Sequence, residues 1–587
     1  MNKNQFTAFF RKGNRATWCV FALLALLTFI KCVIFQWEVY HSIMISSLWR
    51  DPLSFWSFWL PKIGISIFLA SFVFFWKHNY WTVVLELLID TWMLANMFYL
   101  RSNGILFDGF TFTMANNMNG FWNSVWALFQ WKDIIPYLLT FIYLVILYFL
   151  NKTGRNFAWR PGLVILLIAV LINWLAFALV QQFSVRFYLH GMGKEEHTTF
   201  YYMKYNPFAY SYRLNLQPMN KDYGFHNFSV VHGFIYVMMD YIHNLQEMEH
   251  PYILTKEELS IAQQFRGTNT ELTYDNLLLI IIIESLESWT IDSSILPHIT
   301  HFMETHPVLY VKYLKSQIVG GSSADGQMII NTGVLPIQQG ATCFRYPYIT
   351  YPSLINRRDS AVTILTHSAN CWNQAVMGEA YGYDATIEGT VEDSLLSERI
   401  INYAKRNYHN IQGITVASHV PFNYADCSSL KLPEEMPMQM NKYMRCLNWT
   451  DEGLGVLLER IDSIPQLTNA TILITGDHTI FWKEKRDAFS AYCKKKNLPY
   501  QPENGFVPLI VYSPNKITKS LTIEDICYQM DIYPTILSLI GAEDYYWKGF
   551  GVNLLDSAAR QNRPISEEEA YILSDKLIRS NWFANRK

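Results

Sequence analysis

The chain has 587 residues, too many for one ordinary domain. It is 51% hydrophobic and only 16% charged, whereas average soluble proteins carry roughly 25% charge, so we expect a membrane part. The net charge of -2 gives no indication of nucleic acid as a partner, and the eight cysteines form no C-x-x-C pair, which argues against a zinc ribbon or a thioredoxin site.

Five long apolar segments precede residue 185. A helix needs ~20 residues to span a bilayer, and the fourth segment reaches this length by including Ile134 and Ile135. The first is too long for a signal-peptide core and no small-residue cleavage site follows it. The sequence therefore predicts a transmembrane domain over residues 1–183, with helices at about 17–36, 57–76, 80–100, 137–150 and 162–183.

The distribution of Lys and Arg predicts the orientation of these helices, because cytoplasmic loops are enriched in basic residues. One side carries Lys3, Arg11, Lys12, Arg15, Lys77, Lys152, Arg155 and Arg160, and the other only Arg50, Arg101 and Lys132. We expect a cytoplasmic N-terminus. Since the helix number is odd, everything after Gln182 then lies outside the cytoplasm, as in a multi-pass protein of the cell (inner) membrane.

Three charged residues fall inside the apolar segments. Glu86 and Asp90 are four residues apart and share one face of the third helix, and Lys31 lies in the first helix. Charges at bilayer depth mark either a function or a paired contact. The plainer interpretation is that Lys31 pairs with a carboxylate and holds the bundle together.

Residues 184–270 are predicted to connect the membrane domain to a C-terminal domain. The apolar stretch 228–242 is too short to span a bilayer, so we expect a packed helix. Thr255 and Glu258 match a capping box, which starts a helix. Upstream, the tryptophan-rich loop 119–133 is typical of a helix lying in the head-group region.

Strand and helix patterns alternate from residue 276 onward. Runs that are apolar on both faces suit central strands of a parallel sheet covered by helices. They are residues 276–283, 360–367, 411–419, 470–478 and 506–513, with helical patterns at 392–406 and 442–461 between them. The sequence predicts an open, mostly parallel α/β sheet within residues 271–587, whose sites form at the carboxyl ends of the strands.

Several of these strands end in side chains that bind metals. Glu284 follows the first, His367 and His419 end two others, and Asp477 and His478 follow TILITG. A single histidine at a strand end is typical of an ordinary loop residue. Two carboxylates and an imidazole at one sheet edge can instead meet around a divalent cation. The glycine before Asp477 lets the chain turn so that both adjacent side chains reach one ion.

The stretch VGGSSADGQMIINTG, residues 319–333, offers a nucleophile. Glycines precede Ser322 and Ser323, so a flexible turn could bring a hydroxyl to both a metal and a phosphate. A hydroxyl bound to a divalent cation loses its proton more easily. By itself, the same stretch is more typical of a Gly/Ser surface loop than of a catalytic turn.

Together these stretches resemble the lipoteichoic acid synthase family, within the alkaline phosphatase and sulfatase superfamily. The N-terminal half resembles it in layout, with five membrane helices, a connector and an extracytoplasmic catalytic domain. The C-terminal half matches by motifs in the same order and spacing: IIIIESLESW, GGSSADGQMIINTGVLP, CWNQAVMGEAYGYD, ASHVPF, ITGDHTIFW, FVPLIVYSP and DIYPTILSLIG. The resemblance implies an α/β alkaline phosphatase-like (sulfatase) domain with a mostly parallel central sheet.

The resemblance also implies a metal site. Glu284 corresponds to the family's metal-binding glutamate, with Glu287 as the alternative, and Asp477 and His478 match its Asp-His pair. The oxygen of Ser323 would complete a set of ligands for one divalent ion. Its mixed oxygen and nitrogen atoms suit Mn²⁺ or Zn²⁺.

The substrate side of the site is implied in the same way. The family's nucleophilic threonine falls on Ser323, or on Ser322 if the register shifts by one. His419 matches a histidine near the substrate phosphate, and Trp372 matches a tryptophan lining the head-group pocket.

Three departures from the family pattern concern this side of the site. The nucleophile would be serine. Gln374 stands where the family has an arginine that grips the head group, which removes a bidentate phosphate contact. His367 lies two residues closer to Trp372 than its counterpart does. These departures leave the exact head group open.

The implied activity is that of a membrane-bound, metal-dependent transferase. It would move phosphoglycerol or phosphoethanolamine from a phospholipid donor to a glycan or lipid acceptor through a covalent phosphoserine-type intermediate. Two alternatives remain: a sulfuric or phosphoric ester hydrolase of the same superfamily, and a non-catalytic membrane sensor or scaffold that kept a metal site. The formylglycine-type sulfatases are disfavoured, because Gly326 stands where they have arginine.

The cysteines leave their pairing open. Outside the cytoplasm disulfides are allowed, and the six cysteines expected there are Cys343, Cys371, Cys427, Cys446, Cys493 and Cys527. Cys19 and Cys32 lie in the first membrane helix as apolar residues.

Overall fold

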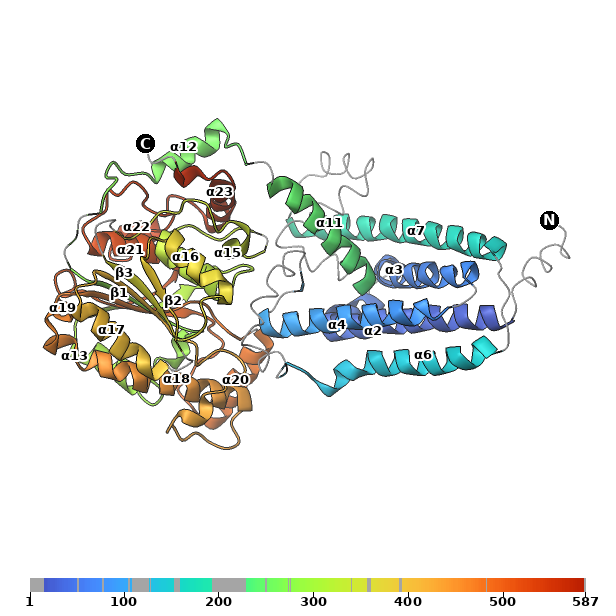
Figure 1. Cartoon of the computed structure of the whole chain (residues 1–587), viewed down its shortest axis with the longest axis horizontal. Helices are drawn as coiled ribbons and strands as arrows, with labels where there is room; N and C mark the ends of the chain where they lie inside the picture. The colour runs from blue at the N-terminus through green and yellow to red at the C-terminus, as the bar shows by residue number, and fades with distance from the viewer. Residues whose placement is uncertain are drawn as a thin grey trace. The chain divides into compact units, whose positions relative to one another are not determined.

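The computed structural model divides into two compact units, one of Met1–Gly109 with Leu128–Leu245 and the other of Phe110–Ala127 with Gln246–Lys587 (Figure 1). The described residues are 15–49, 52–76, 79–103, 106–107, 126, 128–152, 159–192, 229–248, 251–272, 274, 276–338, 340–355, 360–389, 393–481 and 483–584. Most of the loop 119–133 lies outside them, so its predicted interfacial helix stays a prediction.

The N-terminal unit contains five helices that are long and apolar enough to cross a membrane, as predicted. They run side by side in Figure 1. Their candidate spans are Arg15–Val39, Phe58–Phe75, Trp81–Arg101, Trp131–Leu150 and Trp159–Leu179. The elements that carry them are α2 (Arg15–Trp49), α3 (Pro52–Ser71) with η1 (Phe72–Phe75), α4 (Trp81–Asn103), η3 (Trp131–Ile134) with α6 (Ile135–Lys152), and α7 (Trp159–Met192).

Two helices in this region extend past the apolar stretches that predicted them. α7 continues to Met192, beyond the apolar segment 162–183. The stretch expected to be a packed helix over 228–242 is α11, Val230–Met248. Trp92 of α4 donates its indole N–H to the carbonyl of Val230 at 2.9 Å, which anchors the start of α11 in the same unit.

A buried ion triad ties three of the apolar helices together. Lys31 Nζ lies 2.8 Å from Glu86 Oε2 and 2.6 Å from Asp90 Oδ1, and all three side chains are buried. Thr28 donates to Glu86, while Thr140 accepts from Lys31 and donates to Asp90. The predicted pairing of Lys31 with a carboxylate is thus confirmed, and it involves both carboxylates.

The C-terminal unit is built on an eight-stranded sheet in the order β4-β3-β5-β1-β6-β7-β2-β8. The strands are β1 (Leu278–Ile283), β2 (Val308–Lys315), β3 (Ala361–Leu365), β4 (Ala385–Ile387), β5 (Asn410–Ile414), β6 (Thr471–Gly476), β7 (Val507–Tyr512) and β8 (Leu521–Tyr528). Only the pairs that β7 makes, with β6 and β2, are antiparallel. The predicted mostly parallel sheet is therefore correct.

Helices cover both faces of this sheet (Figure 1). The longer ones are α12 (Lys256–Gln264), α13 (Pro297–Thr305), α14 (Ser323–Thr332), α16 (Gln374–Ala380), α17 (Leu396–Lys405), α18 (Met438–Leu458), α20 (Lys483–Lys496), α21 (Ile532–Leu539) and α23 (Glu567–Arg579). The short ones include α15 (Thr342–Arg345), α19 (Pro465–Thr468), α22 (Ser557–Gln561), η5 (Ser288–Thr290), η6 (Cys371–Asn373), η7 (Asp393–Leu395), η8 (Ala425–Cys427), η9 (Ile461–Ser463), η10 (Gln529–Asp531) and η11 (Trp582–Ala584). The capping box at the start of α12 forms as predicted between Thr255 and Glu258.

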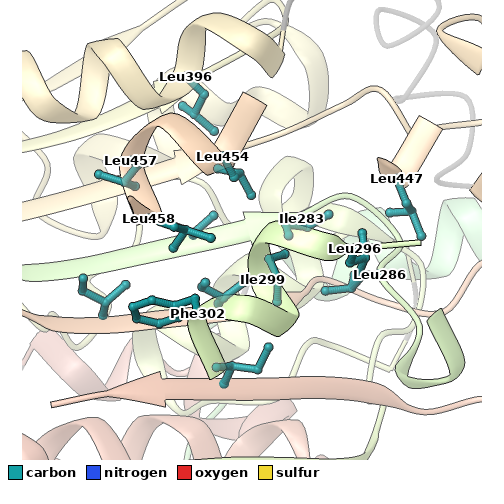
Figure 2. Packing of buried hydrophobic residues seen from close by; sticks show 14 of the residues in the cluster. Ile283, Leu286, Leu296, Ile299, Phe302, Leu396, Leu447, Leu454, Leu457 and Leu458 are labelled. Carbon is teal, nitrogen blue, oxygen red and sulfur yellow. The ribbon is translucent and has the colours of Figure 1, made fainter. Parts of the chain in front are cut away.

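A large apolar cluster covers one face of the sheet and reaches the carboxyl end of β1. Figure 2 shows Ile283 and Leu286 packed among leucines of α17 and α18 and against Ile299 and Phe302 of α13. Burying each of these side chains stabilises the fold by roughly 1.5–3 kcal/mol compared with leaving it exposed to water. This packing gives the turn after β1 a rigid base.

The eight cysteines are all free thiols.

Replacing Lys31 with methionine tests the ion triad. The change leaves Glu86 and Asp90 buried and adjacent without a cation, so we expect the free energy of unfolding to fall by about 3 kcal/mol. The measurement is thermal unfolding of the full-length protein in detergent. Lys132→Met is the matched control, because its pair with Glu38 is partly exposed and should contribute less than about 1 kcal/mol. Equal loss in both variants would contradict the assignment.

Candidate functional site

Four neighbouring parallel strands bring the predicted side chains to one edge of the sheet. In the order β3-β5-β1-β6, each strand pairs in parallel with the next, so all four carboxyl ends lie together. His367 follows β3, His419 follows β5, Glu284 follows β1, and Asp477 and His478 follow β6.

Glu284, Asp477 and His478 converge at this edge. One potential ligand atom from each lies within 4.8 Å of the other two. His478 Nε2 is 3.7 Å from Glu284 Oε1 and 3.7 Å from Asp477 Oδ2. Nδ1–H of His478 donates to the Thr479 carbonyl at 3.1 Å, which leaves Nε2 as the nitrogen with a lone pair facing the two carboxylates.

Ser323 is the first residue of α14, and its hydroxyl faces this cluster. Its Oγ lies 3.2 Å from Glu284 Oε2 and 3.2 Å from His478 Nε2. Ser322 precedes the helix with φ 41° and ψ -117°, a backbone conformation that costs of order 1–3 kcal/mol for a residue other than glycine. Of the two candidate nucleophiles, Ser323 is the one whose oxygen meets Glu284 and His478.

Two close approaches fix the position of Ser323. Asp325 Oδ2 accepts hydrogen bonds from the backbone N–H of Val319 (2.9 Å) and Gly321 (2.8 Å), which closes the glycine-rich turn. One turn into α14, Gly326 packs directly on the turn after β6. A Cβ there would lie 2.3 Å from the Asp477 carbonyl oxygen, so only glycine fits.

The electrostatics of the cluster favour a bound cation. Burial, together with the charge of Asp477, raises the pKa of Glu284 to about 8. Burial lowers the pKa of His478, but the charges of Asp477 and Glu284 outweigh this and raise it overall. Asp477 Oδ2 is buried and has no hydrogen-bond partner among the described residues. Two adjacent buried carboxylates with an oxygen to spare, beside an imidazole lone pair, form a donor set that fits a divalent cation.

Neighbouring polar groups hold the two carboxylates in place. The backbone N–H groups of Ser285 and His478 donate to Asp477 Oδ1 at 2.7 and 2.8 Å. The Ser285 hydroxyl donates to Glu284 Oε1 at 2.7 Å. Sequence reasoning did not identify Ser285 as a site residue, although it directly follows Glu284. Its φ of 54° shows how sharply the chain turns here.

The two other histidines lie near one another at the same edge. Nδ1–H of His419 donates to the Val420 carbonyl at 2.6 Å, and burial lowers the His419 pKa. Burial and the charge of His419 lower the pKa of His367 to about 4. His367 Nδ1 is buried without a hydrogen-bond partner among the described residues. Both imidazoles are therefore neutral at pH 7.

Trp372 and Gln374 lie in the segment that follows β3. Trp372 and Asn373 of η6 adopt left-handed backbone conformations, with φ of 53° and 55°. Asn373 donates to the carbonyl of Cys343 at 2.9 Å, and the Trp372 ring lies 6.3 Å from the Phe344 ring. Gln374 is buried, and its Oε1 has no hydrogen-bond partner in the described part of the chain.

Glu287, the alternative to Glu284, points elsewhere. Its two carboxylate oxygens accept hydrogen bonds from both terminal nitrogens of the Arg486 guanidinium, each at 3.0 Å. It is not part of the group of Glu284, Asp477 and His478. The sequence contained no signal for Arg486, which lies in a charged helix typical of a solvated surface.

The chain is similar to known proteins over nearly its whole length. Residues 1–206 match the family model of the lipoteichoic acid synthase N-terminal domain. A lipoteichoic acid synthase of Staphylococcus saprophyticus is 20% identical, over 98% of this chain and 90% of its own length. One from Staphylococcus aureus is 19% identical, over 96% of this chain and 88% of its own length.

One solved structure shares the fold of most of the chain. It is the integral membrane protein lipooligosaccharide phosphoethanolamine transferase A from Neisseria meningitidis, with a TM-score of 0.54 and 12% identity, covering 89% of this chain and 96% of that one. The sulfatase family model matches residues 205–542, more than half of the 587 residues. The chain therefore belongs to the sulfatase family, and its N-terminal part is of the lipoteichoic acid synthase type.

Proposed function

We propose that the chain is a membrane-bound phosphotransferase that moves a phospho-head group from a phospholipid to a hydroxyl of a glycan or lipid. The observation that carries this proposal is the Ser323 hydroxyl, 3.2 Å from both Glu284 and His478 at the edge of a sulfatase-family sheet. The relatives named lipoteichoic acid synthase and the fold shared with a phosphoethanolamine transferase support transfer of a phosphate-bearing group.

Glu284, Asp477, His478 and the Ser323 oxygen would hold one divalent ion, Mn²⁺ or Zn²⁺. A cation bound there would lower the pKa of the serine hydroxyl and draw charge from a phosphate oxygen. The unpartnered Asp477 Oδ2 and the lone pair of His478 Nε2 are the features that support this assignment.

Ser323 acts as the nucleophile in the first half-reaction. Its Oγ forms a bond to phosphorus while the bond from phosphorus to the diacylglycerol oxygen breaks, and the diacylglycerol leaves as an alcohol after taking up the proton lost by the serine. The product is a covalent phosphoserine-type intermediate. Because Ser323 is the first residue of α14, the N-terminal N–H groups of the helix add favourable charge near the phosphate.

His419 acts in the second half-reaction. Its Nδ1–H is committed to the Val420 carbonyl, so its Nε2 is the nitrogen that can accept a proton. It takes the proton of the incoming sugar or lipid hydroxyl while that oxygen bonds to phosphorus and the bond to Ser323 breaks, and this proton then passes to the Ser323 oxygen, which restores the hydroxyl. We assign His367, Trp372 and Gln374 to the side of the site that would bind the head group. Gln374 is neutral and cannot make the bidentate phosphate contact that an arginine makes at this position. This position therefore excludes neither phosphoglycerol nor phosphoethanolamine as the head group.

The basic residues of the N-terminal half support the orientation. A cytoplasmic N-terminus with five spans places the catalytic domain, taken as residues 271–587, outside the cytoplasm. Phospholipids of the outer leaflet would then be the donors, with residues 184–270 as the connector.

Replacing the two serines separately tests the nucleophile. We expect Ser323→Ala to reduce turnover by at least about 10³-fold, because no oxygen remains to attack phosphorus, while Ser322→Ala retains measurable transfer. The assay follows head-group label from phosphatidylglycerol and from phosphatidylethanolamine into product. Label on a glycan or lipid indicates transfer, whereas label released as free head group in wild type would assign the chain to the hydrolases. Wild-type phenotype with both serines removed would indicate a scaffold.

Metal removal provides an independent test. The purified full-length protein should contain about one Mn²⁺ or Zn²⁺ per chain, measured by elemental analysis. Saturating metal at about 100 times its Kd should stabilise the protein by roughly 2.7 kcal/mol in thermal unfolding. Asp477→Asn should abolish this stabilisation, whereas Ser323→Ala should keep most of it because three ligands remain. Identical metal content in the wild type and in Asp477→Asn would refute the proposed metal site.

A further inference from the structure

A second buried carboxylate lies beside the candidate metal site and is fully hydrogen-bonded. Glu287 accepts from Arg486 Nη1 and Nη2 (3.0 Å each), from the Trp289 indole (2.6 Å), and from the backbone N–H groups of Ile480 (2.8 Å) and Phe481 (3.3 Å). Its side chain is 0% exposed. Five donors to one carboxylate are far more than charge neutralisation requires.

Arg486 is equally committed. Its Nε donates to the Phe481 carbonyl at 2.5 Å, so all three guanidinium nitrogens have partners on this network. Gly505 lies against the guanidinium, and a Cβ at that position would lie 2.2 Å from Arg486 Nη1. The side chains of Arg486 and Glu287 are 9% and 0% exposed. The pair is therefore buried, and its hydrogen bonds and the close approach of Gly505 constrain its geometry.

The network joins the two turns that carry the candidate metal ligands. Glu287 lies three residues after Glu284, in the turn after β1, and Ile480 and Phe481 follow His478 in the turn after β6. A third element fixes the first turn: the Tyr443 hydroxyl of α18 donates to the Ser285 carbonyl at 2.6 Å and accepts from the Glu287 N–H at 3.1 Å.

We propose that the Glu287–Arg486 pair is a positioning element that holds Glu284 and His478 in ligating geometry. The proposal rests on the proposed metal site. Neither residue touches the cluster of candidate ligands, so the pair acts through the two backbone turns. A buried ion pair adds little net stability compared with a well-packed apolar pair, whereas groups that orient metal ligands strongly affect metal affinity.

The test measures metal affinity separately from fold stability. The full-length protein in detergent is titrated with Mn²⁺ by calorimetry, and its unfolding temperature is measured without metal. Glu287→Gln keeps the shape and an acceptor for Ile480 but breaks the bidentate pair. We expect the Mn²⁺ affinity to fall by about 10- to 100-fold.

Asp451→Asn is the matched control. Asp451 is also a buried carboxylate that accepts from two backbone N–H groups, those of His298 and Ile299, but it holds the start of α13 rather than a ligand-bearing turn. It should change the unfolding temperature of the metal-free protein while leaving the Mn²⁺ affinity within about twofold of wild type.

A double variant covers the case in which Glu287→Gln fails to fold. Glu287→Gln with Arg486→Met removes both charges, so no unpaired buried charge remains and we expect the fold to be retained. The two ligand-bearing turns are then no longer connected by the ion pair. Weak Mn²⁺ binding by this variant, with a wild-type unfolding temperature, supports the proposal. Wild-type Mn²⁺ affinity in either variant overturns it. Absence of Mn²⁺ and Zn²⁺ binding in the wild type would instead refute the metal site itself.

Discussion

Two buried carboxylates, Glu284 and Asp477, lie side by side at the ends of β1 and β6, and the site is organised around that unfavourable proximity. Leaving water costs each of them solvation, and each charge raises the cost of the other. Hydrogen bonds from Ser285 and from the His478 backbone offset part of this cost. The remaining negative potential attracts a cation to the space between the two carboxylates, and the Ser323 hydroxyl faces the same space.

The two units of the chain treat paired carboxylates in opposite ways. In the N-terminal unit, Glu86 and Asp90 share one resident cation, Lys31, so part of their charge is neutralised from within the chain and the helices are held together. At the sheet edge no lysine or arginine among the described residues forms an ion pair with Glu284 or Asp477. The first arrangement is typical of a structural element and the second of a site that takes its cation from solution.

Much of this organisation could be predicted, for identifiable reasons. The strands β1, β3, β5, β6 and β7 are buried throughout, so all except β5, which contains Asn410 and Gln412, appear as largely apolar runs, and the polar residues after the strands mark the edge of the site. Strands β2 and β8 were missed because they are partly exposed, and β4 because it has only three residues. The role of Glu287 could not be predicted: its partner Arg486 is distant in sequence, and the resemblance to the family made Glu287 the alternative metal ligand instead.

The contact between Gly326 and the Asp477 carbonyl has a consequence for how the chain can vary. Even a methyl group at position 326 would push α14 away from the turn after β6 and carry Ser323 out of reach of His478. A residue with no functional group thus sets the separation between nucleophile and ligands. In a library of random substitutions, this position should tolerate as little as the reactive residues do, and its intolerance would reflect spacing rather than chemistry.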